Sequence, residues 1–472
     1  MLTVVNALTL FLLISLGLLY FLGLGWLVIG PIFHGSLIKR KNTDSRFIEL
    51  PIIFISGLII NYGIVLLVQS LKISFIICCI FAIFGSIFYS AMLFKTLKHK
   101  PLSHNLILKM FGIFLVCGLL LGPILFIPLM EWDARSIWFF HAKMIFSAGT
   151  FSQLTGWQNP AVIDFSHADY PNLLPTMAAQ ISYVMGFWNE YLPKLSLFFL
   201  LVPAVSLLFT FAKRSMSFLF LIIIIVFSFS PKLWDGHMDG YLALYFAISM
   251  LLLGRYYKYS KTIDLFSSLI FLLVLLYFKN EGNLALISGF SSVFFVILLK
   301  KKSISLHLLV RKYWKYVAFL IVLLLPFGIW NIYKHQWGLS NDLGIGTNQS
   351  IEQLLIRLND GSFRIILENV YGQVQNSLML FGFIIIASLL FLKKVHKEIL
   401  PALITAGIYC LGMISIYLIT PLDLVNHLND SVSRTMLSVV ACLYIASYFL
   451  VEALENQEKD MVISGDKLRK VF

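Results

Sequence analysis

Long apolar stretches follow one another along the whole chain, with short polar segments between them. Many of these stretches reach the roughly 20 residues that an α-helix needs to cross a hydrocarbon layer. We expect spans near residues 5–30, 47–69, 73–94, 108–130, 193–212, 216–230, 240–253, 264–278, 283–299, 317–333, 377–392, 399–420 and 434–453. The pattern predicts an all-α polytopic membrane protein with about 13 transmembrane helices.

The composition supports the class of a polytopic membrane protein, and the first apolar stretch is expected to belong to it. Of the 472 residues, 59% are hydrophobic and 12% are charged. Residues 5–30 have no basic segment before them and are too long for a signal peptide, so we expect a retained span. Because the composition is that of a membrane protein, we expect a single embedded body in place of several soluble domains.

The positive charge of the chain follows its topology. The formal net charge is +13, which would fit a nucleic-acid partner if the charges formed one surface. Instead, 26 of the 36 Lys and Arg residues fall in short segments at 39–46, 95–109, 213–214, 254–261, 300–315 and 393–397 and in the C-terminal tail. Cytoplasmic loops are enriched in Lys and Arg, so an N-terminus on the outside puts every cluster in the cytoplasm. We expect no nucleic-acid partner.

Four segments then face outward, at 131–192, 231–239, 334–376 and 421–434. Inside the first of them, residues 171–188 are apolar enough to be considered as a span. If they crossed the membrane, all later basic clusters would move to the outside, against the charge rule. We therefore expect a re-entrant or interfacial helix there, on the outer face.

The first outer segment begins with the sequence EWDARSIWFFHAKMIF at 131–146, directly after a span. Residues 134–148 have a helical pattern with a thin polar stripe of Ser136, Lys143 and Ser147. Such a helix should lie in the plane of the membrane surface and hold Asp133 at the level of the lipid headgroups. The segment continues to HADYPNLLP at 167–175, where prolines precede the next apolar helix.

These features together resemble the C-type glycosyltransferase superfamily. The resemblance rests on an acidic residue just past a span, a juxtamembrane helix, a His-x-x-x-Pro-x-Leu motif before a second helix, and a later Asp at the start of a span. It is closest to the branch with protein O-mannosyltransferases and lipid A aminoarabinose transferases, and it covers roughly residues 110–300. It implies a lipid-linked sugar donor, a catalytic Asp in the first outer loop and a conserved module of several spans.

Carried over by position, the resemblance makes Asp133 the catalytic acid and matches Asp239 to the Asp of the second outer loop. It matches HADYPNLLP to the family's His-Pro-Pro-Leu motif, here in a stretched form, and Lys279 to a basic residue between two later spans. It also divides the chain into extra N-terminal helices at 1–107, a catalytic transmembrane module at 108–333 and a C-terminal outer loop with helices at 334–472. The three spans before the module and the acceptor-side loops depart from the family pattern.

The ionisable residues outside the basic clusters gather at the outer ends of the expected spans, which supports the same site. We expect Asp133 and Asp239 to be catalytic. The expected substrate-binding residues are Glu131, Arg135, His167, Asp169, Tyr170, His237, Lys279, Glu281 and Arg434. Cations there can hold a phosphate leaving group while a carboxylate takes the proton of the acceptor. No resident cofactor is required, although two carboxylates can share a divalent ion.

Each of these residues also has a structural explanation. Asp133 can anchor a helix end, Asp239 can be a helix N-cap, and His167 can stabilise a loop. The remaining alternatives are a simple pair between Lys279 and Glu281, an interfacial anchor at Arg434, and headgroup contacts at Arg135 and Lys143.

The leading hypothesis is a hexosyl- or pentosyltransferase of a bacterial plasma membrane. It would move a sugar from a polyprenyl-phosphate carrier to an extracytoplasmic glycan, lipid or protein, with Asp133 as the general base. One alternative is a glycan polymerase or ligase that uses pyrophosphate-linked oligosaccharides. Another is a lipid or solute transporter, but transporters place ionisable residues near the bilayer midplane on broken helices, and the sequence shows no such pattern.

Overall fold

The computed structural model describes residues 7–37, 44–99, 104–209, 211, 215–224, 229–300, 306–339, 348–392 and 396–469. Helices make up nearly all of this part of the chain, and it contains no β-strand. The prediction of an all-α protein is confirmed.

Ten segments in the described part are long and apolar enough to cross a membrane. They lie on α1 (Ala7–Leu37), α2 (Asp44–Val68), α3 (Leu71–His99), α4 (His104–Phe126), α8 (Leu195–Phe209), α13 (Gly282–Leu299), α14 (Leu306–Trp337), α16 (Ser362–Leu392), α17 (Leu400–Ile419) and α19 (Leu437–Arg469). The protein is therefore a polytopic membrane protein by length and composition of its helices. Three further expected spans coincide with α9 (Ser215–Ile224), α11 (Asp239–Tyr259) and α12 (Thr262–Val274), which do not meet the same criterion. The number of 13 spans stays a prediction.

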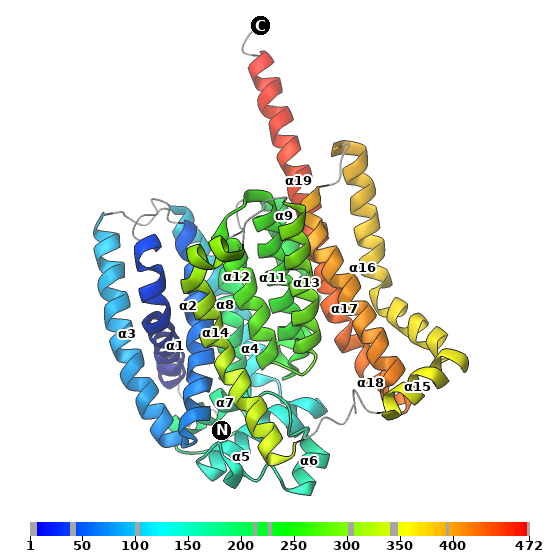
Figure 1. Cartoon of the computed structure of the whole chain (residues 1–472). Helices are drawn as coiled ribbons and strands as arrows, with labels where there is room; N and C mark the ends of the chain where they lie inside the picture. The colour runs from blue at the N-terminus through cyan, green and yellow to red at the C-terminus, as the bar shows by residue number, and fades with distance from the viewer. Residues whose placement is uncertain are drawn as a thin grey trace.

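Helix α11 lies in the middle of the bundle (Figure 1). Every residue from Asp239 to Gly254 is buried, and the helix packs against α12, α17 and α19. The helices α1, α2 and α3 pack together at one side of this core. The first residue of α11 is thus fixed by contacts along the whole helix behind it.

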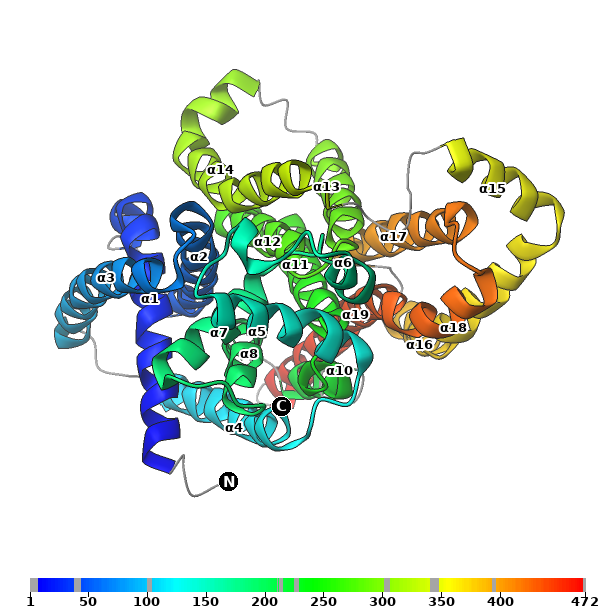
Figure 2. The same ribbon diagram turned by 90° about the horizontal axis from the view of Figure 1, so that it is seen from below.

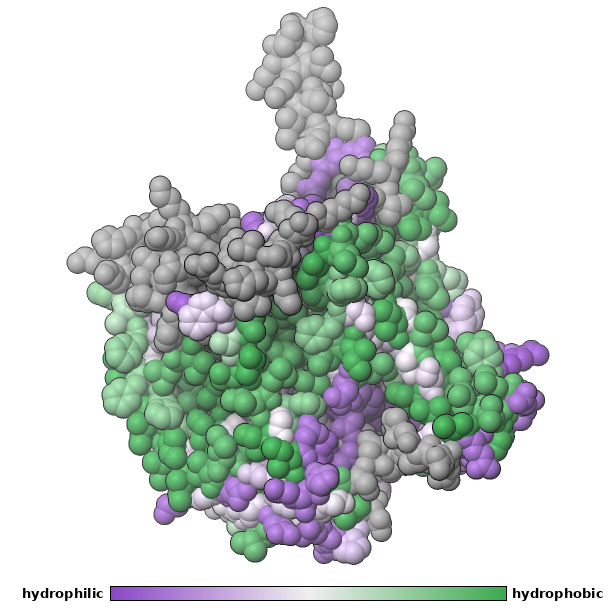
Figure 3. Space-filling model, viewed as in Figure 1, coloured by the Kyte–Doolittle hydropathy of each residue, from purple (hydrophilic) through white to green (hydrophobic). Residues whose placement is uncertain are grey.

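The short helices gather at one end of the bundle, which we call the loop end. It carries α5 (Phe139–Ala148), α6 (Pro160–Ser166), α7 (Leu173–Met185), α10 (Ser230–Trp234), α15 (Asn348–Asn359) and α18 (Leu424–Thr435). Figure 2 shows α5 and α7 lying across the ends of the long helices. The described parts of all four expected outer segments lie at this end, and the C-terminal end of α19 lies at the other (Figure 1). Figure 3 shows a hydrophobic surface over the middle of the molecule and hydrophilic residues toward the loop end.

The segment 131–192 is built of helices, as expected. A short π-helix, η1 (Ala134–Trp138), continues into α5, and together they cover the predicted helix at 134–148. The apolar segment 171–188 forms α7, whose 13 residues are too few to cross a bilayer. It is packed against α5 and buries nine of its residues, and its interfacial or re-entrant placement stays a prediction.

Candidate functional site

Five ionisable side chains form a continuous charge network at the loop end. Arg434, in the last turn of α18, donates a hydrogen bond to Asp133 and lies 3.8 Å from Asp239 Oδ2. Lys279 donates to Asp239 Oδ1 at 3.0 Å and lies 3.0 Å from Glu281 Oε1. The order Asp133, Arg434, Asp239, Lys279, Glu281 alternates in sign, and it joins four segments that are far apart in the sequence.

The inner part of the charge network is almost free of solvent. Asp239 is 3% exposed and Lys279 is 4% exposed, while Asp133 and Arg434 keep about a sixth of their side chains accessible. Asp239 Oδ2 and Glu281 Oε2 are buried and make no hydrogen bond to any described residue. The network therefore holds three carboxylates and two cations, with acceptor atoms still unused.

Burial acts against the charge of both inner residues, and pairing outweighs it. Burial alone would lower the pKa of Lys279, but Asp239 and Glu281 raise that pKa above its usual range. Burial alone would raise the pKa of Asp239, but Lys279 and Arg434 lower it to about 2. Both groups are consequently charged at neutral pH.

Two glycines allow the backbone to bring these segments together. Gly282 follows the turn of Lys279 to Glu281, and a Cβ on it would lie 2.0 Å from the carbonyl oxygen of Leu275. Gly236 has a φ of 91°, which favours glycine, and a Cβ on it would lie 2.6 Å from the Cβ of Ala134. The second outer loop can therefore pack directly on η1, beside Asp133.

A second group of ionisable residues lies next to the charge network. His237 Nδ1 is 3.1 Å from Asp235 Oδ2, and His237 Nε2 is 3.9 Å from Glu131 Oε2. Lys232 Nζ is 3.0 Å from Asp235 Oδ2 and 3.4 Å from His237 Nδ1. Burial alone would raise the pKa of Asp235, but His237 and Lys232 lower it below its usual value.

This second group could hold a metal ion. Glu131, Asp235 and His237 each offer one ligand atom, and these atoms lie within 4.8 Å of one another. The ammonium group of Lys232 already lies beside Asp235 and His237, so an ion would have to displace it. An ion shared by Asp133 and Asp239 fits less well, because the guanidinium group of Arg434 contacts both carboxylates.

The HADYPNLLP segment reaches the charge network through Asp169. Asn280, the residue after Lys279, donates a hydrogen bond of 2.6 Å to Asp169 Oδ2. Trp330 donates to the backbone oxygen of Asp169 at 3.3 Å. His167 and Tyr170 stack on each other with ring centroids 5.2 Å apart, and they lie two residues before and one residue after Asp169 in the chain.

The sequence reasoning missed His141. This side chain is fully buried in α5, with Nδ1 2.9 Å from Asn172 Oδ1 and Nε2 3.1 Å from Ser166 Oγ. It therefore ties α5 to both ends of the segment that carries His167, Asp169 and Tyr170. Burial lowers the pKa of His141 to about 4, although its two hydrogen bonds act to raise it. The available signal was a lone histidine in an apolar helical run, which a single sequence does not distinguish from a packing residue.

Two of the structural alternatives can be compared with the geometry. Asp239 is the first residue of α11 after the N-cap Met238, and no side-chain capping bond forms there. The pair of Lys279 and Glu281 is present, but Lys279 also binds Asp239, so it is more than a local pair. Asn280 and Lys232 join the site without having been selected from the sequence.

Arg135 does not belong to the charge network. It lines a pocket of about 420 Å³, which we call the rim pocket, together with Lys143 on the same helical segment. The other lining residues are Pro128, Leu129, Phe139, Phe140, Trp188, Glu190 and Tyr191.

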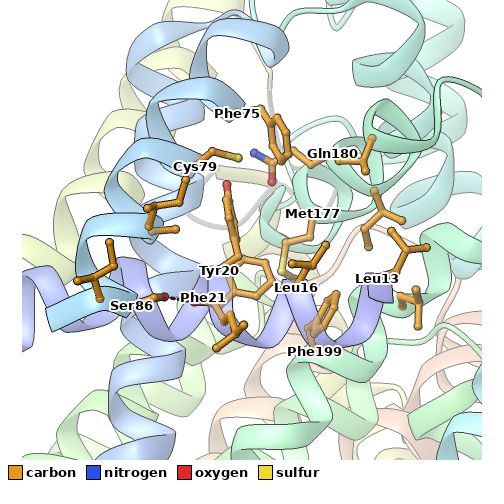
Figure 4. Close-up of a pocket in the computed structure, with 18 residues that line it drawn as sticks. Leu13, Leu16, Tyr20, Phe21, Phe75, Cys79, Ser86, Met177, Gln180 and Phe199 are labelled. Atoms are coloured by element: carbon orange, nitrogen blue, oxygen red, sulfur yellow. Dashed lines mark hydrogen bonds between the residues drawn. The ribbon is translucent and has the colours of Figure 1, made fainter. Parts of the chain in front are cut away.

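Another pocket, of about 470 Å³, lies between α1, α3, α7 and α8 (Figure 4). Leucine, isoleucine and aromatic side chains line most of it, and no charged residue does. Its few polar groups are already engaged, since Tyr20 donates to Asn61 and Asn61 exchanges hydrogen bonds with Gln180. This apolar pocket can contact hydrocarbon, and its lining has none of the charged side chains found in the charge network.

No protein-family model, no curated protein and no solved structure matches this chain. The functional conclusion therefore depends on the residues and their geometry.

Proposed function

We propose that the chain is a membrane glycosyltransferase that transfers a sugar from a polyprenyl-phosphate donor to an extracytoplasmic acceptor, with Asp133 as the general base. The observation that carries the proposal is the charge network, in which Arg434 joins Asp133 to the buried pair of Asp239 and Lys279. It lies at the end of the bundle, where a lipid carrier would present its phosphate and sugar. The resemblance of the first outer loop to C-type glycosyltransferases supports the same assignment.

Arg434 is the group that would respond to the donor. Its guanidinium can form a bidentate contact with phosphate, and such charge-assisted bonds are strong in a site that excludes water. A phosphate that takes contacts from Arg434 leaves the carboxylate of Asp133 free to accept a proton. Lys279 remains between Asp239 and Glu281 and adds positive potential behind the phosphate.

The reaction would then proceed by direct displacement. The hydroxyl oxygen of the acceptor forms a bond with the anomeric carbon and gives its proton to Asp133. The bond between that carbon and the phosphate oxygen breaks, and the polyprenyl phosphate leaves with the electron pair while Arg434 stabilises its charge. A single displacement inverts the configuration of the anomeric carbon.

The test compares the wild type with Asp133→Asn, both reconstituted in lipid nanodiscs. In separate assays each is supplied with polyprenyl-phosphate hexoses or pentoses or with pyrophosphate-linked oligosaccharides, and with envelope lipids and glycans as acceptors. Loss of a general base should lower turnover by roughly 10²- to 10⁴-fold, because the amide cannot take the proton. Glu368→Gln is the control, since that carboxylate lies in an exposed pair with Arg364 on α16.

Two results would overturn the proposal. Wild-type turnover in Asp133→Asn would remove the base from the mechanism. Consumption of pyrophosphate-linked oligosaccharides alone, with every monosaccharide-phosphate lipid left intact, would assign the chain to the glycan polymerases or ligases.

A further inference from the structure

The rim pocket lies where two candidate spans end. Pro128 and Leu129 lie two and three residues after the end of α4, and Glu190 and Tyr191 come just before the candidate span that begins at Leu192. The ends of spans mark the boundary between hydrocarbon and water, where lipid phosphates are found and where Trp and Tyr are enriched. Trp188 and Tyr191 in the lining fit this depth.

Two cations in this pocket have no acidic partner. Arg135 and Lys143 are exposed, and among the described residues neither makes an ion pair. The η1 and α5 helices present both side chains to the same pocket, two helical turns apart. Free positive charges at the depth of lipid phosphates favour an anionic group.

A third cation lies behind the lining. Lys194 is fully buried and donates a hydrogen bond of 2.7 Å to the backbone oxygen of Ile127. Its ammonium is also 5.3 Å from the centre of the Tyr191 ring. When it is protonated, Lys194 adds to the positive potential of the pocket, because a buried charge is screened less than an exposed one.

The carboxylate of Glu190 in the lining suits hydroxyls. Trp188 Nε1 donates to Glu190 Oε1 at 3.0 Å and so orients the carboxylate. Asn189 accepts hydrogen bonds from the backbone of Tyr191 and Leu192, which fixes the turn. A carboxylate beside aromatic rings can accept hydrogen bonds from a polyol while the cations hold a phosphate.

We propose that the rim pocket binds the phosphate of an anionic membrane lipid whose headgroup carries hydroxyls, with Arg135 and Lys143 as the phosphate ligands. This site is separate from the charge network and goes beyond the transfer reaction. The volume of about 420 Å³ accommodates one headgroup.

The proposal is tested by lipid binding to the purified full chain in detergent, measured by native mass spectrometry. Phosphatidylglycerol should bind more tightly than zwitterionic phosphatidylcholine. Arg135→Ala combined with Lys143→Ala should weaken phosphatidylglycerol binding by at least about tenfold. Lys72→Ala is the matched control, because Lys72 is an exposed lysine at the start of α3, and it should bind as the wild type does.

A second variant and a soluble probe complete the test. Lys143→Arg keeps the charge and should keep binding, which separates lost charge from lost folding. Glycerol 3-phosphate carries the same phosphate and hydroxyls without the lipid chains, and equal affinity for it would overturn the lipid source. Unchanged phosphatidylglycerol binding in the double alanine variant would overturn the site. Asp133→Asn should bind phosphatidylglycerol as the wild type does. Lipid binding therefore tests the rim pocket and sugar transfer tests Asp133, and the failure of one proposal is distinguishable from the failure of the other.

Discussion

At the scale of single residues, Lys279 is tightly constrained. Its ammonium lies between two carboxylates and is almost completely buried. The cost of burying this charge is offset only while both partners stay in place. The same arrangement fixes the position of Asp239, which has one further contact with Arg434.

Replacing Lys279 by methionine should therefore destabilise the protein strongly. The change leaves the buried Asp239 and the partly buried Glu281 with one cation nearby, and breaking a buried pair typically costs about 3 to 5 kcal/mol. The measurement is thermal unfolding of the purified protein in one detergent at pH 7.5. Lys72→Met, at an exposed site, should stay within about 0.5 kcal/mol of the wild type. A Lys279→Met protein as stable as Lys72→Met would show that the inner pair does not hold the site together.

Sequence reasoning identified the members of the charge network but, apart from the local pair of Lys279 and Glu281, it did not identify the pairs between them. Asp133, Asp239, Lys279 and Arg434 stood out because they are ionisable residues outside the basic clusters. Their pairing spans 301 residues between Asp133 and Arg434, and no periodicity connects positions so distant. Arg135 was grouped with them because it is close to Asp133 in the chain, whereas the helix directs it into the rim pocket.

At the scale of elements, the first outer segment was predictable where its pattern was local. The helix at 134–148 follows from its spacing of apolar residues, and α7 follows from its prolines and its length. The contact between them depends on His141, which binds Asn172 and Ser166 across the segment. Such a contact needs the fold to exist, so the sequence alone could not show it.

The buried His141 should make the protein sensitive to acid. Its pKa is about 4 in the folded chain and near the ordinary 6.5 in the unfolded chain. Between these values the unfolded chain binds a proton that the folded chain does not, so stability falls as pH is lowered from 6.5 to 4. The loss should reach about 3 kcal/mol at the lower limit, at roughly 1.4 kcal/mol per pH unit.

Thermal unfolding at pH 7.5, 6.5, 5.5 and 4.5 measures this effect. His141→Gln has no titrating group at this position, so its stability should depend less on pH over this range than that of the wild type. Because the substitution itself changes packing, the comparison uses the slope of stability against pH and not the stability at a single pH. Equal slopes for the two proteins would show that His141 does not control the acid sensitivity.

At the scale of the whole molecule, hydropathy predicted the class, and the charge distribution predicted which segments share an end. The ten candidate spans and the gathering of short helices at the loop end agree with both expectations. The number of spans was harder to predict, because α9, α11 and α12 are short or carry charge at their ends. A buried helix such as α11 can be more polar than a lipid-facing one, since its neighbours cover it.

The orientation of the bundle remains a prediction from the basic clusters, and cysteine labelling in intact cells tests it. The five native cysteines, three of them buried, are first replaced so that background labelling is low. Ser147 is an exposed residue of α5 at the loop end, and Lys261 is an exposed residue of the basic turn between α11 and α12. Because cytoplasmic loops collect Lys and Arg, an impermeant maleimide should label Ser147→Cys in intact cells and Lys261→Cys only after permeabilisation. The reverse pattern would put the charge network in the cytoplasm, where an extracytoplasmic acceptor could not reach Asp133.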